Sequence, residues 1–251
     1  MRTNKSVKSN LVFGLLPFLL SGCNLFNRSA IIYEYGFLKY IHLGDNSSFQ
    51  LKEDKSIVIV GFNNNALEQE RIDIPKEING YEVKRIGLRD EGFNHNNNRN
   101  VECGEKIKKI FLLGDIEKVE YFNGENVDFF ICSEEPVFFI NSRSKYKNVY
   151  IPNSAYLKNL EEKNIAEKDA HFFAANIRFD LNYLNDKQQS LYRIDHIDSG
   201  EKIYAPENPT REGYAFSGWY TEKECLTSWD FNCIPTISSE EFVLYASWKN
   251  N

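Results

Sequence analysis

The stretch NPTREGYAFSGWYTEKECLTSWDF, residues 208–231, holds two of the three tryptophans in a chain of 251 residues. Pro209 favours an extended entry, and Gly213 and Gly218 permit tight turns. Between these residues stand large aromatic side chains, which bury the most area per residue where core volume is scarce: Tyr214, Phe216, Trp219, Tyr220, Trp229 and Phe231. We therefore interpret the rings as the core of a small domain rather than as a ligand cage.

The segments on either side of this stretch alternate apolar and polar residues, which predicts half-buried strands. Residues 190–198 predict one strand. In residues 176–184 one face would hold Ile177, Phe179, Leu181 and Tyr183, and the other Arg178, Asp180 and Asn182. In residues 241–248 one face would hold Phe242, Leu244, Ala246 and Trp248. The pattern predicts a compact β domain over residues 176–251.

The order of these residues resembles the Listeria–Bacteroides repeat, also called the internalin B-repeat. The segments PTREGYAFSGWYT (209–221), WDF (229–231) and LYASW (244–248) stand in the order typical of that family. The resemblance covers residues 176–249. It implies a β-grasp-like fold that occurs on bacterial surface proteins as a spacer or as a partner-binding unit, and it implies no active site.

Residues 31–160 contain short β-like runs at recurring intervals. These runs are residues 56–62, 71–75, 82–87, 107–113, 116–122, 127–132, 136–141 and 147–152. Each run is too short to bury an apolar face alone, but runs stacked in register would share one core, as in a solenoid. The pattern predicts a mainly β unit built by stacking.

Residues 56–87, SIVIVGFNNNALEQERIDIPKEINGYEVKRIG, resemble the opening of a BspA-type leucine-rich repeat. The segment VYIPNSAYLKNL (149–160) resembles the way in which such arrays close. The polar insert NHNNNRN (94–100) departs from the repeat, which leaves the number of repeats open. We interpret the insert as a solvated loop, with a recognition loop as the alternative.

A short helix is expected in the closing segment. Asn153 or Ser154 would cap it, and it would turn Tyr156, Leu157 and Leu160 toward the core. The expected fold is thus mainly β, with a short leucine-rich-repeat solenoid over residues 31–160. A linker over residues 161–175 would join it to the β-grasp-like domain.

The first 23 residues, MRTNKSVKSNLVFGLLPFLLSGC, have a basic start, an apolar run and then small residues, as secretory signals do. The residues Leu20, Ser21, Gly22 and Cys23 resemble the lipobox of bacterial lipoproteins. That resemblance implies cleavage before Cys23 and lipidation of its thiol; two or more acyl chains give durable attachment. We expect a signal peptide over residues 1–22, an anchor and tether over 23–30, and a location on the outer face of a bacterial membrane. The alternative is an ordinary signal peptide that ends near a cysteine.

Charge and cysteine content limit the partners. The net charge is −6, and without residues 1–22 the chain has 27 basic and 36 acidic residues, a net charge of −9. Such a chain is repelled by phosphate backbones, so we expect no nucleic-acid partner. The cysteines after the lipobox are Cys103, Cys132, Cys225 and Cys233, which could form two disulfides or remain free thiols. None has Cys-x-x-Cys spacing, so we expect no zinc site.

No catalytic motif stands in the sequence, and we expect neither an enzyme nor a cofactor. The segment DHID (195–198) is interpreted as a solvated strand end, with a weak metal site as the alternative. The expected function is binding of another protein or of a host surface; the alternative is a structural spacer or envelope-complex subunit. A ligand-binding solenoid should expose a contiguous aromatic patch on one face, whereas a spacer should be uniformly polar.

Overall fold

The computed structural model describes residues 31–42, 56–88, 100–135, 137–139, 144–162, 171–237 and 241–251. The described chain is mainly β, as expected, and is divided among several sheets. None of its helices has the length and apolar character needed to cross a membrane. The expected signal peptide, the tether and most of the asparagine-rich insert lie outside the described residues.

The first half of the chain is built from short strands. In order, these are β1 (Tyr33–Tyr35), β2 (Leu38–His42), β3 (Ser56–Phe62), the 3-10 helix η2 (Ala66–Glu68), β4 (Arg71–Ile74), β5 (Glu77–Ile78), β6 (Tyr81–Ile86), β7 (Val101–Glu102), β8 (Lys109–Leu112), β9 (Lys118–Val119), β10 (Phe122–Asn123), β11 (Asp128–Ile131), β12 (Phe138–Phe139), β13 (Asn148–Ile151), α1 (Ser154–Glu162) and β14 (Phe172–Ala174). The second half has β15 (Ile177–Asp180), β16 (Leu191–Asp195), β17 (Tyr214–Tyr220) and β18 (Phe242–Asn250).

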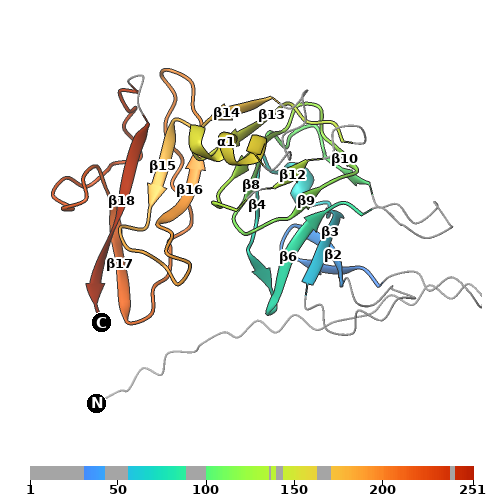
Figure 1. Cartoon of the computed structure of the whole chain (residues 1–251), viewed down its shortest axis with the longest axis horizontal. Coiled ribbons are helices and arrows are strands. Elements are labelled where there is room, and N and C mark those ends of the chain that lie inside the picture. The colour runs from blue at the N-terminus through green and yellow to red at the C-terminus, as the bar shows by residue number, and fades with distance from the viewer. Residues whose placement is uncertain are drawn as a thin grey trace, which may run out of the picture.

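From β3 to β14 the chain winds through two larger sheets, and β7 and β10 form a small parallel sheet of their own (Figure 1). Strands β3, β6, β9 and β12 pair in parallel in that order, and strands β4, β8, β11, β13 and β14 pair in parallel in the other sheet. The chain alternates from one sheet to the other at almost every step. Short strands are stable in this arrangement because the inner strands are paired on both sides and all of the strands contribute to a shared core.

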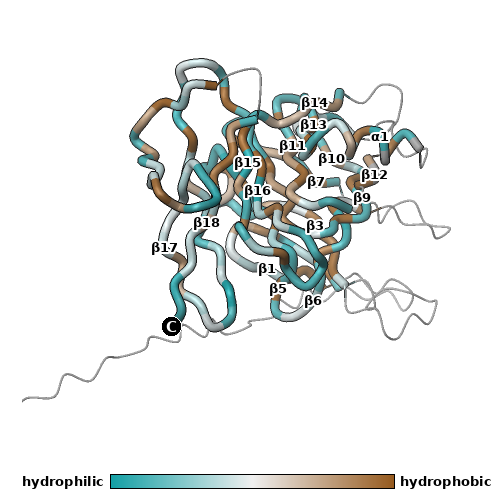
Figure 2. The backbone as a smooth tube through the Cα atoms, turned by 60° about the vertical axis from the view of Figure 1, so that its left-hand side comes forward, coloured by the Kyte–Doolittle hydropathy of each residue, from teal (hydrophilic) through white to brown (hydrophobic). Residues whose placement is uncertain are grey.

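The main core lies between these two sheets. Register brings Ile72, Ile110, Phe129 and Val149 into one row across the second sheet. All four are buried in the same cluster as Ile57 and Val83 of the first sheet. Figure 2 shows the hydrophobic colour concentrated on strands in the middle of the molecule and the hydrophilic colour on peripheral turns. The short apolar runs therefore bury their faces together, as the sequence indicated.

Helix α1 begins as expected. Of the two candidate caps, Asn153 is the one used: its Oδ1 accepts a hydrogen bond of 3.0 Å from the backbone N–H of Tyr156. Tyr156 and Leu160 are buried, and Leu157 packs against the same core. The Tyr156 hydroxyl also donates to the carbonyl of Glu135 at 2.9 Å, which ties the helix to the loop before β12.

Removing this cap should weaken the closing helix measurably. Asn153→Ala deletes the acceptor for the Tyr156 N–H, and loss of such a cap costs about 1 kcal/mol of folding free energy. Urea denaturation followed by circular dichroism measures this loss. Ser154→Ala is the matched control, since it changes an exposed neighbour and leaves the cap in place. Equal losses in the two variants would contradict the assignment.

Residues 176–251 form a separate four-stranded sheet in the order β16-β15-β18-β17. Its central strands β15 and β18 are parallel, and both outer strands are antiparallel to their neighbours. Phe179, Trp219, Leu244 and Ala246 are buried at its core, and further rings pack around them: Phe216, Trp229, Phe231, Phe242 and Trp248. Four of the six rings expected in the core are thus part of it, whereas Tyr214 and Tyr220 are half-buried outside this cluster.

Two features of this sheet differ from the expectation. Strand β15 ends at Asp180 rather than at residue 184, because Asn182 adopts a positive φ of 58°. Asp180 was expected on the polar face but is buried, since a register shift follows Phe179. Its carboxylate accepts hydrogen bonds from the Ser190 hydroxyl at 2.7 Å and from the Asn182 N–H at 2.8 Å, so burial leaves it satisfied.

The two units meet without a long connection. Strand β14 pairs in parallel with β13, and only two residues separate it from β15. β14 lies within the range expected to be a linker, residues 161–175, so the chain enters the second unit directly from the sheet of the first. A junction this short limits how far the two units can move apart.

Candidate functional site

The second parallel sheet carries a row of stacked rings on the face turned away from the main core. Register places Phe111 beside Phe130, and Phe130 beside Tyr150. The ring centroids of the first pair are 4.5 Å apart and those of the second pair 4.8 Å, with interplanar angles of 19° and 9°. Phe173 extends the row on β14, with its centroid 6.1 Å from that of Tyr150.

Cations line the same face beside the rings. Arg71 and Lys109 are neighbours in the register of β4 and β8. The Arg71 guanidinium lies 4.8 Å from the Phe111 centroid, and the Lys109 ammonium 5.2 Å from that of Phe130. Because a ring face attracts cations, the sheet presents a joint cationic and aromatic surface, which we call the ladder face.

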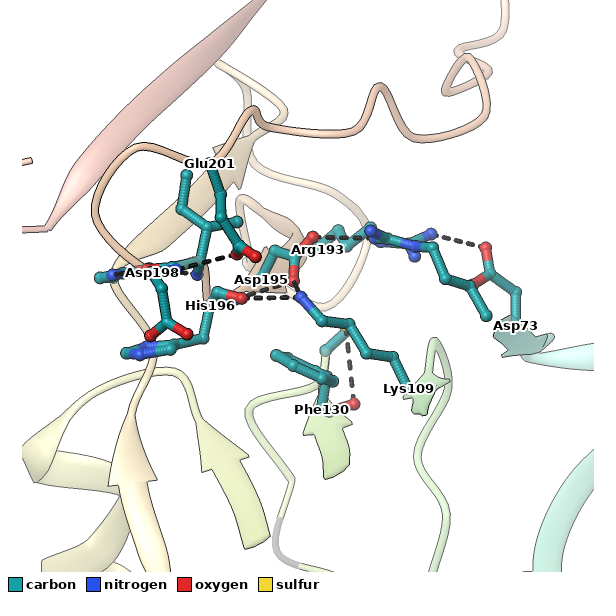
Figure 3. Close-up of polar contacts among 12 residues, drawn as sticks. Asp73, Lys109, Phe130, Arg193, Asp195, His196, Asp198 and Glu201 are labelled. Carbon is teal, nitrogen blue, oxygen red and sulfur yellow. Dashed lines mark hydrogen bonds and ion pairs between the residues drawn. The ribbon is translucent and has the colours of Figure 1, made fainter. Parts of the chain in front are cut away.

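Strand β16 of the second unit covers the ladder face. Leu191 and Ile194 pack in one cluster with Phe111 and Phe130. In Figure 3, Lys109 lies between the Phe130 ring and the carboxylate of Asp195. The row of rings is therefore not the exposed aromatic patch expected of a ligand-binding solenoid, because Phe111 and Phe130 are buried under a segment of the same chain.

Asp195 is the centre of the polar contacts. It is fully buried, and its two carboxylate oxygens are each 2.8 Å from a cation, Oδ2 from Arg71 and Oδ1 from Lys109. Lys109 also donates to the backbone carbonyl of His196 at 2.7 Å. Burial alone would raise the pKa of Asp195, but the two cations and their hydrogen bonds outweigh it and hold the pKa below its ordinary value.

A second ion pair crosses the contact in the opposite direction. Arg193 of β16 is buried, donates to Asp73 Oδ2 at 2.5 Å, and stacks 3.6 Å from the Phe111 centroid. Each unit thus supplies both acidic and basic side chains to the ion pairs of the contact. A third pair, Lys187 with Asp115, lies in the same contact and is more exposed. Buried pairs of this kind fix the geometry of an interface, because each charge depends on its partner for solvation.

The interpretation of DHID as a solvated strand end is wrong for Asp195. Its partners Arg71 and Lys109 lie 124 and 86 residues earlier in the chain, and only folding brings them together. Asp198 remains exposed. Across the described residues, no group of three or more His, Cys, Asp and Glu side chains is arranged to hold a metal ion.

His196 completes the contact. Its ring stacks on that of Tyr150, with centroids 4.6 Å apart and an interplanar angle of 25°. Burial lowers its pKa and Lys109 acts in the same direction, whereas the nearby acids Asp198, Asp195 and Asp128 oppose this shift. The net pKa lies below the ordinary value, so folding favours the neutral ring.

The contact between the two units should become less stable as the pH falls. An unfolded histidine titrates near pH 6.5, so the neutral His196 contributes stability that is fully present above about that pH. The contribution is lost as the pH falls through the lower pKa of the folded state. We expect the urea midpoint of the wild-type chain to drop between about pH 7 and pH 5. His196→Phe keeps a stacked ring without titration and should drop less.

His171→Phe provides the control for that measurement, because His171 is exposed. Its pH profile should follow that of the wild type. Identical profiles for His196→Phe and the wild type would show that the stacked histidine does not couple the contact to pH.

A second candidate surface lies in the repeat unit, in the loop over residues 221–227. Leu226 there is 80% exposed, more than any other large hydrophobic residue that the structure describes. The loop is held in place: Thr221 N–H donates to Thr227 O at 3.1 Å, and Glu222 accepts from the Thr227 N–H at 3.1 Å. An apolar side chain on a fixed loop is suited to contact a partner, since little conformational entropy remains to be lost.

The cysteines are free thiols in the structure: Cys103, Cys132, Cys225 and Cys233. Burial raises the pKa of Cys103 and of Cys132 to about 12 in each case. These two thiols are therefore protonated at neutral pH and are poor nucleophiles. The residues that resemble a lipobox, Leu20, Ser21, Gly22 and Cys23, lie outside the described residues.

Four residues that join the units were not predicted from the sequence: Arg71, Asp73, Lys109 and Arg193. In the runs RIDI (71–74), KIFL (109–112) and LYRID (191–195) these charges occupy one side of an alternating pattern, which normally indicates a solvent-facing side. The alternation is the same whether these positions face water or face another domain, so the pattern does not distinguish the two cases. The one sequence feature that hinted at the contact is that RIDI and LYRID each carry one basic and one acidic residue, so they can pair with each other.

Comparison with known proteins identifies one part of the chain. Residues 176–247 match the Listeria-Bacteroides repeat domain family. Internalin H of Listeria monocytogenes is 40% identical over 55 residues, which is 22% of this chain and 10% of internalin H. Two proteins of Evansella cellulosilytica whose names describe membrane proteins are each 38% identical over 52 residues, or 21% of this chain.

The chain spans only a small share of these relatives, 10% of internalin H and 8% and 6% of the two Evansella proteins. The similarity therefore concerns a domain and not a whole protein. The match agrees with the aromatic core of the four-stranded sheet, which lies within the matched residues. Residues 176–247 are a Listeria–Bacteroides repeat domain.

Proposed function

We propose that the chain is a lipid-anchored protein of the bacterial cell surface that binds another protein through its repeat domain. In this proposal residues 1–22 are a signal peptide, Cys23 carries the lipid, and residues 23–30 form the tether. The names of the relatives, an internalin and membrane proteins, support a surface or membrane location. The proposal includes no catalysis, cofactor or nucleic-acid partner.

We further infer that residues 31–160 form a short solenoid of the BspA leucine-rich-repeat type. The alternation of the chain between two parallel sheets with a shared core supports this inference. The parallel central pair of strands in residues 176–251 supports a β-grasp-like assignment for the second domain. The ladder face would then be the surface on which the repeat domain is mounted.

The observation that carries the binding proposal is the loop over residues 221–227. This loop lies within the region matched to the repeat family, exposes Leu226 and is fixed by backbone hydrogen bonds. The same region turns most of its large rings inward, so an outward leucine on a fixed loop has no role in the core of the described chain.

A saturable binding assay tests the proposal. Fluorescent protein, released from its membrane in detergent, is titrated onto intact host cells and onto the bacterium that produces it. Saturable binding to one surface, reduced roughly tenfold or more by Leu226→Ser, is the expected result, as for removal of a hot-spot residue. Ile234→Ser is the matched control, because Ile234 is also an exposed aliphatic residue, 54% exposed.

The alternative is a structural spacer or envelope-complex subunit without a ligand of its own. One observation favours it: the ladder face, which would be the binding surface of an isolated solenoid, is covered within the same chain. In that case neither cell surface should show saturable binding, while the wild-type and variant chains unfold at the same urea concentration.

A further inference from the structure

We propose that the β1–β2 hairpin rests against the headgroup layer of the membrane that anchors Cys23, and that the turn at Gly36 and Phe37 makes the contact. This inference rests on the proposed lipidation. It adds an interaction surface and an orientation: one end of the molecule faces the lipid, and the repeat domain faces away.

Exposed apolar side chains are concentrated on this hairpin and on the two residues that lead into it. Of the eleven large hydrophobic residues exposed in the described chain, four fall within seven positions. These four are Ile31, Ile32, Tyr35 and Phe37, exposed by 57%, 48%, 48% and 39%. Isolated exposed apolar residues are ordinary on a protein surface, but a group of them marks an interaction surface. Aromatic side chains also favour the interface between hydrocarbon and water.

The turn of the hairpin is rigid. Tyr35 pairs with Leu38, and Gly36 has a φ of 55°, so the two strands join through Gly36 and Phe37 alone. Asn63 fixes this turn from the neighbouring loop, since its side-chain amide donates to Gly36 O at 2.8 Å and Phe37 O accepts from its N–H at 3.0 Å. A preformed surface loses little conformational freedom when it makes contact.

The charge of the hairpin permits approach to a lipid surface. Among residues 31–42 the only Asp, Glu, Lys or Arg residues are Glu34 and Lys39, and they are paired across the two strands. They cancel in net charge, so headgroups of either sign would not repel the hairpin strongly. Edge strand β1 pairs with β2 alone, and its remaining backbone groups can hydrogen-bond to water and headgroups in the interfacial layer.

The tether makes the membrane the expected occupant. Eight residues lead from Cys23 to Ile31, a reach of at most about 29 Å when fully extended. A surface tethered so closely meets lipid at high effective concentration. In Figure 1, β2 of the hairpin lies on the right of the molecule beside β3, whereas β17 and β18 lie at the opposite end.

Photo-crosslinking in the producing bacterium tests the inference with the full chain. A photo-reactive benzoylphenylalanine is introduced at Phe37 in one strain and at Tyr204 in another; Tyr204 is an aromatic residue, 62% exposed, located after the second unit begins. After illumination, mass spectrometry identifies the adducts. We expect a phospholipid adduct at position 37 and none above background at position 204. Equal urea midpoints of the labelled chains confirm that both fold.

Other outcomes overturn the inference. A protein adduct at position 37, or no lipid adduct there, would mean that the hairpin does not face the bilayer. The mass of the N-terminal peptide from the same sample shows whether Cys23 carries lipid. If it does not, the proposed anchor itself fails; if it does, a negative crosslink refutes only the orientation.

Discussion

Replacing Asp195 with asparagine is expected to lower the free energy of unfolding by about 3 kcal/mol, because breaking one side of a buried ion pair leaves its partners uncompensated. Arg71 and Lys109 each lose their charged partner at 2.8 Å, while the shape of the side chain is conserved. Both cations remain about one-fifth exposed, at 22% each, so water relieves part of the cost and the lower end of the usual range applies.

Urea denaturation at pH 7, followed by tryptophan fluorescence, measures this loss, because the three tryptophans all lie in the second unit. Asp198→Asn is the matched control: it makes the same chemical change three residues later, at an exposed position, and should cost little. The double variant with Lys109→Met should be less destabilised than the sum of the two single variants, as coupled neighbours are. A loss below about 1 kcal/mol would mean that Asp195 does not hold the units together.

Phe130→Ala should lower the free energy of unfolding by as much as Asp195→Asn or more. Phe130 is fully buried between Phe111 and Tyr150 and touches the cluster that joins the two units. Removing such a ring from a packed site costs about 3–5 kcal/mol, through lost burial and the cavity that remains. It also removes the ring over which Lys109 lies.

Phe173→Ala tests the same ladder at its exposed end and serves as the control. Phe173 is 47% exposed, so its truncation should cost less than about 1 kcal/mol. Thermal and urea unfolding of the two variants should therefore differ clearly. Comparable losses would indicate that the second unit does not cover Phe130 in solution.

The contact that Asp195 and Phe130 make between the units also affects whether the two units unfold together. If β16 is held to the ladder face as the structure shows, the two units should unfold in one transition, monitored equally by tryptophan fluorescence and by circular dichroism. Asp195→Asn should then separate the transitions, with the second unit unfolding first. A single transition would mean that the repeat domain keeps a fixed direction relative to the first unit.

Local sequence patterns predicted some of the secondary-structure elements and missed others. The β-branched run of β3, the alternation in β18 and the cap of α1 were all predicted, because each depends on residues close together in sequence. Strand β17 was not predicted. The shift in its pairing at Gly218 interrupts the alternation from Tyr214 onward, and that shift depends on the partner strand β18.

Among the candidate sites, too, those formed by neighbouring residues could be predicted and those formed by distant residues could not. The resemblance to a lipobox rests on contiguous residues and could be stated from the sequence; these residues lie outside the described ones, so lipidation stays a prediction. The pairing of Asp195 with Arg71 and Lys109 joins residues on different sheets, so no local window contains it. Burial of the ladder face likewise depends on where β16 lies.

The sequence by itself determined that the chain is mainly β, that most of the aromatic residues over 208–231 belong to a core, and that residues 176–251 make a unit of their own. Those properties follow from period, turn residues and composition, which act over a few neighbours. Only the tertiary structure decided that the second unit lies on the ladder face of the first and that Asp195 is buried rather than solvated. The reason is physical: a charge in an alternating strand can face water or an opposite charge equally well, and the choice depends on which surface the rest of the chain brings to it.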